Sequence, residues 1–168
     1  MKNKKKLYIW ILIGLANTTS AYAHTARLDD SASARSTVEA RTVTSETGMP
    51  LAESPSAEFV YSNFGWVQYR LTTSAYKGKS AKIYYVIPNS IEGLQRPHAL
   101  LVSWKTNGQF MDGEGHAGDR ILVWSGTVTD DWMQTDFDLK MQLELDQVRL
   151  AEGKSFEFES YFEIEINE

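Results

Sequence analysis

The segment SFEFESYFEIEINE, residues 155–168, alternates apolar and polar side chains almost without a break, and this pattern strongly constrains the fold. Its large apolar side chains all fall on even positions: Phe156, Phe158, Phe162, Ile164 and Ile166. Successive side chains of a strand point to opposite faces, so this spacing predicts a β-strand with one buried face. Burying these five side chains would contribute on the order of 10 kcal/mol.

Shorter runs of the same kind precede this segment from Phe59 onward. They are GWVQYRLTT (65–73), AKIYYVIP (81–88), HALLVSW (98–104), RILVWSGTVT (120–129) and DFDLKMQLELD (136–146). Turn-forming pairs such as Asn107-Gly108 and a glycine-rich stretch at 113–118 separate these runs. Short strands at this spacing predict an all-β antiparallel sandwich over residues 59–168, without a helix.

The first 23 residues have the pattern of a cleavable export signal. Four lysines precede the apolar run 7–16, which is too short to span a bilayer, and Ala21-Tyr22-Ala23 forms a small-x-small cleavage site. We therefore expect an exported protein that begins at His24 and is not inserted in a membrane after cleavage. An uncleaved N-terminal anchor is the alternative interpretation.

Residues 24–58 are rich in Ser, Thr and Ala and contain no aromatic residue, which predicts a flexible polar arm. Within it TVEARTV (37–43), with Val38 and Ala40, would form a strand only if a partner supplied the rest of a sheet. A solvated linker is the alternative interpretation.

Charge and cysteine content exclude several classes of function. After signal cleavage the chain has 13 basic and 22 acidic residues, a net charge of −9. Nucleic acids and anionic lipids bind basic surfaces, so neither is an expected partner. The chain has no cysteine and therefore no disulfide, so its stability must come from a hydrophobic core.

The sequence contains no motif of an enzyme, and no catalytic residue or cofactor is predicted. The most suggestive cluster is FMDGEGHAGDR, where Asp112, Glu114, His116 and Asp119 are interleaved with glycines. Such oxygen ligands resemble a calcium loop, but their order is not that of an EF-hand. We therefore predict a connector without a metal, and a loop in which these residues are candidates for ligand binding.

Exposed tryptophans would be able to stack on sugar rings. Trp104 and Trp124 lie inside apolar runs and are expected in the core, whereas Trp132, within TDDWMQTD, is the better candidate for exposure.

The signal, polar arm, cysteine-free β body and alternating C-terminal strand together resemble a fimbrial subunit of the chaperone–usher class. Phe156, Phe158, Phe162, Ile164 and Ile166 match the alternation of that family's terminal motif, and Gly153 lies near its glycine. Asn167 holds the penultimate position, where the family has an aromatic residue.

The resemblance implies an immunoglobulin-like sandwich with an incomplete sheet, completed by a donor strand through β-strand addition. It implies a periplasmic chaperone, an outer-membrane usher and other fimbrial subunits as partners, Val38 and Ala40 as a candidate donor strand, and a final location on the cell surface. The expected function is a structural or minor tip subunit of a fimbria. The alternative is a self-sufficient secreted or periplasmic β-sandwich that binds carbohydrate or protein.

Overall fold

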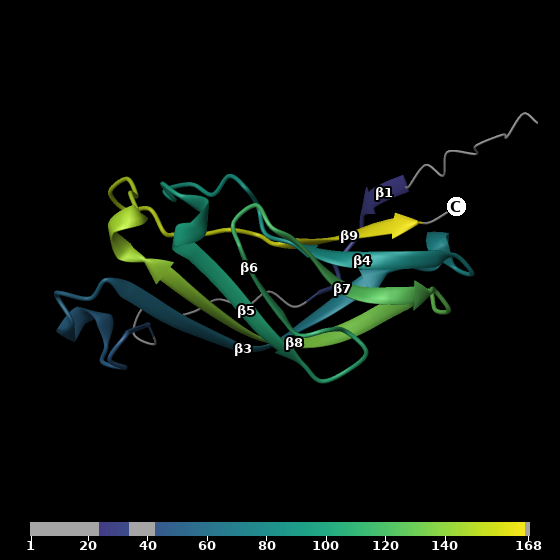
Figure 1. Ribbon diagram of the computed structural model, residues 1–168, viewed down its shortest axis with the longest axis horizontal. Helices are drawn as coiled ribbons and strands as arrows, with labels where there is room; N and C mark the ends of the chain where they lie inside the picture. The colour runs from purple at the N-terminus through teal and green to yellow at the C-terminus, as the bar shows by residue number, and fades with distance from the viewer. Residues whose placement is uncertain (1–23, 34–42, 167–168) are drawn as a thin grey trace, which may run out of the picture.

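Two antiparallel sheets packed face to face make up the protein, as expected for an all-β sandwich. The computed structural model describes residues 24–33 and 43–166. Figure 1 shows the two layers, with β1, β9 and β4 in one and β3 and β8 in the other. The predicted export signal, Val38 and Ala40 lie outside the described residues.

The first layer, sheet A, has the strand order β1-β9-β4-β7. These strands are β1 (His24–Arg27), β9 (Tyr161–Ile166), β4 (Ser80–Val86) and β7 (Arg120–Thr127). Strand β9 therefore lies inside the sheet, with β4 on one side and β1 on the other.

The second layer, sheet B, has the order β2-β3-β8-β5-β6. Its strands are β2 (Thr44–Ser45), β3 (Phe59–Thr72), β8 (Trp132–Glu144), β5 (Leu100–Thr106) and β6 (Gly113–His116). The helical elements among the described residues are four single 3₁₀ turns, at Leu51–Glu53, Ser74–Tyr76, Pro97–Ala99 and Leu145–Gln147.

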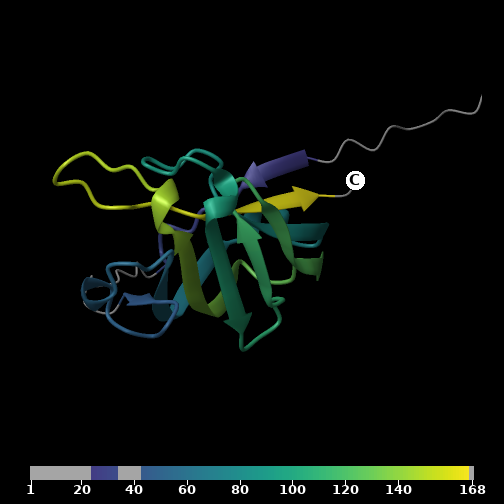
Figure 2. The same ribbon diagram turned by 60° about the vertical axis from the view of Figure 1, so that its left-hand side comes forward.

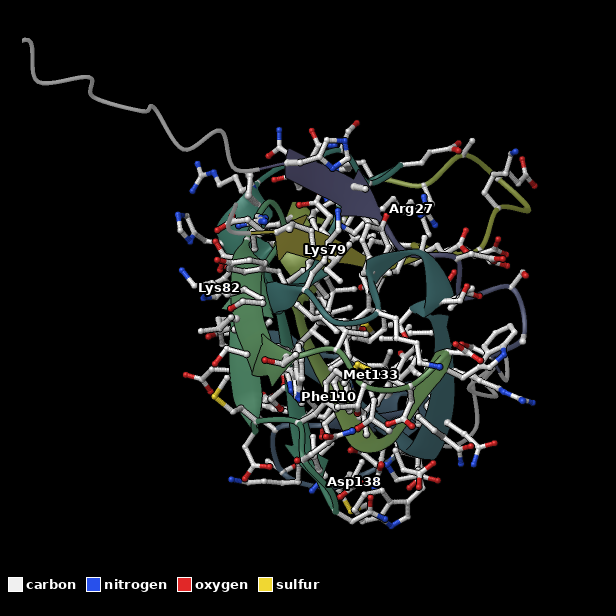
Figure 3. All side chains as sticks on the ribbon, turned by 90° about the vertical axis from the view of Figure 1, so that its right-hand side faces the viewer. Arg27, Lys79, Lys82, Phe110, Met133 and Asp138 are labelled. Carbon is white, nitrogen blue, oxygen red and sulfur yellow. The ribbon has the colours of Figure 1, made fainter. Side chains whose placement is uncertain are left out.

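The core lies between the sheets and is rich in aromatic rings. Tyr85, Phe137 and Phe162 are among its largest fully buried side chains. Figure 3 shows Phe110 and Met133 pointing into this interior. Contacts between rings join the core, with Tyr69 and Phe162 edge to face at 5.0 Å and Tyr85 and Phe162 tilted at 5.1 Å between centroids. Such pairs add specific geometry to the burial of apolar area.

The strand pairings correspond to those at the centre of an immunoglobulin-like sandwich. Strand β3 pairs with β8 as strand B pairs with E, and β4 pairs with β9 as C pairs with F. In a complete sandwich of this kind strand G, which follows F in the chain, lies on the other side of F. Here that place is held by β1, from the N-terminal part of the chain.

The structure differs from the sequence-based expectations in three elements. Residues 24–27 form a strand although they belong to the arm expected to be flexible, and the short β2 pairs with β3. The glycine-rich residues 113–116 form β6 instead of a turn. A Cβ at Gly113 or Gly115 would lie 2.6 Å from the side chain of Trp104 or Ile121, so glycine allows β6 to lie close over these side chains.

Candidate functional site

The outer edge of β9 is paired with β1, and this edge is the candidate site for strand addition. Residues 24–27 run antiparallel to 163–166, with His24 opposite Ile166 and Arg27 opposite Glu163. The Leu28 N–H then donates to the carbonyl of Phe162 at 2.8 Å. Figures 1 and 2 show the two strands side by side at the rim of the sandwich. Backbone hydrogen bonds thus extend sheet A by one short strand.

Leu28 anchors this segment in the core. Its side chain is 2% exposed and belongs to the same apolar cluster as Phe162 and Ile164, while Ala26 packs against that cluster partly buried. Burying a leucine side chain stabilises by about 1.5–3 kcal/mol. The segment therefore combines a backbone ladder with one buried side chain, the two components of peptide recognition by strand addition.

After Leu28 the chain crosses to the other sheet. The Thr72 N–H donates to the carbonyl of Asp29 at 2.9 Å, and the Arg70 N–H donates to the Ser33 Oγ at 2.8 Å. Residues 24–33 therefore contact β9 in sheet A and β3 in sheet B, and they cover the side of the sandwich between these two strands.

Two effects shift the pKa of Asp30, which lies in this crossing, in opposite directions. Burial raises the pKa of the Asp30 carboxyl, and the Arg27 charge acts in the other direction. A carboxyl whose pKa is raised in the folded state favours folding below its ordinary pKa, and this contribution is lost as the pH rises through the raised value. At neutral pH the Asp30 charge therefore opposes the docking of residues 24–33.

The glutamates of β9 point to the outer face of sheet A, where basic side chains pair with them. The Arg120 guanidinium lies 2.7 Å from Glu163 and 3.2 Å from Glu165, and it stacks 3.4 Å above the ring centroid of Tyr84. Lys82 lies 4.0 Å from Glu165. Partly exposed pairs of this kind contribute about 1 kcal/mol or less each. This ion-pair network accounts for the polar side of the alternating pattern.

Of the five apolar residues predicted for the pairing strand, three lie in it. Phe162, Ile164 and Ile166 face inward in β9 and are buried. Phe156 and Phe158 precede β9, half-buried, with their ring centroids 6.1 Å apart. The strand is shorter than predicted because its partner β4 ends at Val86, opposite Tyr161, and Pro88 soon follows. The inward direction of the even positions nevertheless extends back to Phe156.

The candidate ligand residues 112–119 support the local fold in separate ways. Asp112 accepts from the Thr106 N–H at 2.8 Å and from Lys105 at 3.0 Å. Asp119 accepts from the His116 N–H at 2.7 Å, while Glu114 is exposed on β6. Within 24–33 and 43–166 the structure shows no group of three or more His, Asp and Glu side chains that would hold a metal ion.

These contacts give a prediction for Asp112 and Glu114. The hydrogen bond from the Thr106 N–H lowers the pKa of Asp112, so this carboxylate stabilises the fold above its ordinary pKa and less as the pH falls through the lowered value. Asp112→Asn should therefore lower the melting temperature at about pH 7, and the difference should shrink as the pH falls through the lowered pKa. Glu114→Gln is the matched control and should change melting little. Calorimetry with and without calcium should give the same values; a calcium-dependent rise abolished by both substitutions would identify a metal site instead.

Comparison with known proteins adds no family to this description. No protein-family model, curated protein or solved structure matches the chain. The functional argument therefore depends on the strand pairing itself. In the described part of the chain, moreover, no helix is long and apolar enough to cross a membrane.

Proposed function

We propose that the protein is a structural or tip subunit of a bacterial surface fimbria, assembled by β-strand addition. The observation that carries this proposal is the position of β1. The place beside β9 that strand G fills in an immunoglobulin-like sandwich is filled by a segment from the opposite end of the described chain. A second copy of the chain has the same segment and is able to supply the same contacts, as in domain swapping.

The contacts of β1 suit a strand that is exchanged. The ladder covers only four residue pairs, and Leu28 is the fully buried side chain among residues 24–28. Side chains of β1 are otherwise exposed or half-buried, so its removal uncovers one apolar slot and one row of backbone groups on β9. An uncovered strand edge of this kind readily pairs with another chain.

Tethering explains why assembly would need partners. A segment joined to its own groove by a short connection has an effective concentration on the order of millimolar, so the chain's own β1 competes well with that of another copy. A periplasmic chaperone that holds the edge of β9 would keep the groove available. An outer-membrane usher would then present the segment of the next subunit, and the fibre would grow by one exchange per subunit.

Cysteine trapping tests the exchange, since the natural chain has no cysteine. Thr25 and Glu165 are opposite one another in the register of β1 and β9. When chains with Thr25→Cys and chains with Glu165→Cys are produced together in the natural host, which would supply the chaperone and the usher, we expect a mixed disulfide dimer on a non-reducing gel. Each chain has one cysteine and cannot form an intramolecular disulfide. The disulfide between the two chains therefore keeps an exchanged pair linked.

Two controls define the outcome. A chain with both substitutions should close its own disulfide, which shows that the register is correct. A pair with Thr25→Cys and Ser125→Cys should not cross-link, because Ser125 lies on β7, two strands away from β9. If the double variant closes its disulfide and the mixed pair never does, strand exchange does not occur and the proposal is wrong.

A further inference from the structure

The outer face of sheet B has exposed aromatic rings among polar side chains. Trp66 on β3 is 59% exposed, and Trp132 and Tyr61 on the same face are 43% and 36% exposed. The sequence predicted the exposure of Trp132 but gave no role to Trp66. Trp132 is already covered on one ring face, since the Arg70 guanidinium lies 4.9 Å above its centroid. Trp66 is therefore the aromatic side chain with the greatest exposed fraction on this face.

A β-bulge turns Trp66 to the outside. Val60 and Ser62 point inward before the bulge, whereas Val67 and Leu71 point inward after it. The register shifts between Asn63 and Gly65, where Gly65 has φ +67° and its N–H donates to the Asn63 Oδ1 at 2.9 Å. Without this extra residue the alternation from Ser62 would place Trp66 in the core. Bulges that re-aim a side chain in this way are common beside functional sites.

Polar groups flank the indole on the neighbouring strand. Asp138 lies directly across from Trp66 and Asp136 across from Gln68, whose amide donates to Asp136 at 3.3 Å. Lys140, next on the same face of β8, has its ammonium 3.9 Å from Asp138. Hydrogen-bond acceptors and donors thus lie in a row beside an exposed aromatic ring.

A hollow of about 410 Å³ adjoins this row, within the size range of small-ligand sites. Among the residues that line it are Ser103, Lys105, Glu114, Asp138 and Lys140. A second hollow of about 240 Å³ shares Lys140 with the first and is lined in part by Tyr61 and Asn63. The lining of both hollows includes hydroxyl, amide or charged groups suited to a ligand with many hydroxyls.

We infer that this face is a carbohydrate-binding site for a neutral pyranose of a glycan. The apolar C–H face of the sugar ring would lie on the Trp66 indole, and its hydroxyls would donate to Asp136 and Asp138 and accept from Gln68 and Lys140. Carboxylates and lysines lie together on this face, which favours an uncharged ligand over an anionic one. The acidic net charge of the chain does not suit a nucleic acid.

This site is independent of the proposed strand exchange. It lies on sheet B, whereas β1 and β9 belong to sheet A. Figure 3 shows Asp138 at the opposite side of the molecule from Arg27 of β1. A subunit in a fibre would therefore keep this face free, and either proposal can fail without the other.

The test is binding of the exported full chain, biotinylated and displayed on streptavidin for avidity, to an array of oligosaccharides. The oligosaccharides of the array end in glucose, galactose, mannose, N-acetylglucosamine, sialic acid or sulfated sugars. We expect binding to neutral termini, competed by millimolar free monosaccharide. Trp66→Ala should reduce this binding tenfold or more, Asp138→Asn should reduce it also, and Trp66→Phe should keep part of it.

Trp132→Ala is the matched control, since it removes an exposed indole at the other end of the same face. It should leave glycan binding unchanged, and the melting temperature of Trp66→Ala should stay close to that of the natural chain. The inference would be overturned if no glycan bound, or if only the sialylated or sulfated glycans bound. It would also be overturned if Trp66→Ala and Asp138→Asn left the binding unchanged. Self-association lost with Trp66→Ala, without glycan binding, would make the face a protein contact and would overturn it too.

Discussion

Phe162→Asp is expected to leave the chain unfolded at 37 °C. The Phe162 side chain has no exposed area, and its ring centroid lies 5.0 Å from that of Tyr69 and 6.0 Å from that of Phe137. Loss of a buried phenylalanine alone costs about 3–5 kcal/mol, and the carboxylate adds the cost of burying a charge without a partner. The total is comparable with the whole stability of a domain, about 5–15 kcal/mol. Circular dichroism and proteolysis would measure the loss.

Glu163→Gln is the matched control for this substitution, one residue further along β9. Its side chain faces the opposite side of the sheet and loses only the ion pair with Arg120, which contributes about 1 kcal/mol or less. The variant should fold and melt within a few degrees of the natural chain. If Phe162→Asp also folds with little change, β9 is not packed between the sheets and the architecture described above is wrong.

Leu28→Asp is expected to detach residues 24–28 and to lower stability by about 3 kcal/mol, because it replaces a buried leucine with a charge. The two sheets should remain, with the edge of β9 open. A synthetic peptide of residues 24–33 should then raise the free energy of unfolding by RT ln(1 + [L]/Kd), which is about 2.7 kcal/mol at a hundredfold excess over Kd. The melting temperature should rise accordingly. Calorimetry at increasing peptide concentration would measure the shift.

The peptide itself supplies the controls. A peptide with Leu28→Asp should not restore the melting temperature, whereas one with Thr25→Lys should retain the effect, since Thr25 is exposed and lies opposite Glu165. A restoration indifferent to the residue at position 28 would show non-specific adhesion. Unchanged melting of the Leu28→Asp chain would show that the segment contributes nothing to the core.

The sandwich was predictable from sequence because each long strand has its own period-two pattern. Val67 and Leu71 in β3, and Phe137, Leu139 and Leu143 in β8, are buried on the side that the alternation predicts. The predictions for tryptophan are confirmed for the same reason, with Trp104 and Trp124 in the core and Trp132 exposed. These patterns are local, and a local pattern is visible in a single sequence.

Strand β1 was not predictable because its signal is not local. Its only inward apolar side chains are those of Ala26 and the adjoining Leu28, within a polar stretch, and a spacing of two positions is too short to indicate a strand. Its partner strand, β9, lies at the other end of the described chain, and no property of residues 24–28 identifies β9 as the partner. The exposure of Trp66 likewise depends on one bulge at Asn63 and Gly65, which shifts the alternation by one residue.

The pairing of β1 with β9 also determines when the molecule can complete its folding. His24 pairs with Ile166, 142 positions later, and β9 is also the neighbour of β4. Contacts this far apart in sequence form slowly because the entropy of closing a long loop is lost before the contacts form. Until almost the whole described chain has been made, β4 has only β7 as a partner in sheet A, and the edge that pairs with β9 stays open. We therefore expect a long-lived folding intermediate with an open sheet A, and in this interval the chain is most vulnerable to aggregation.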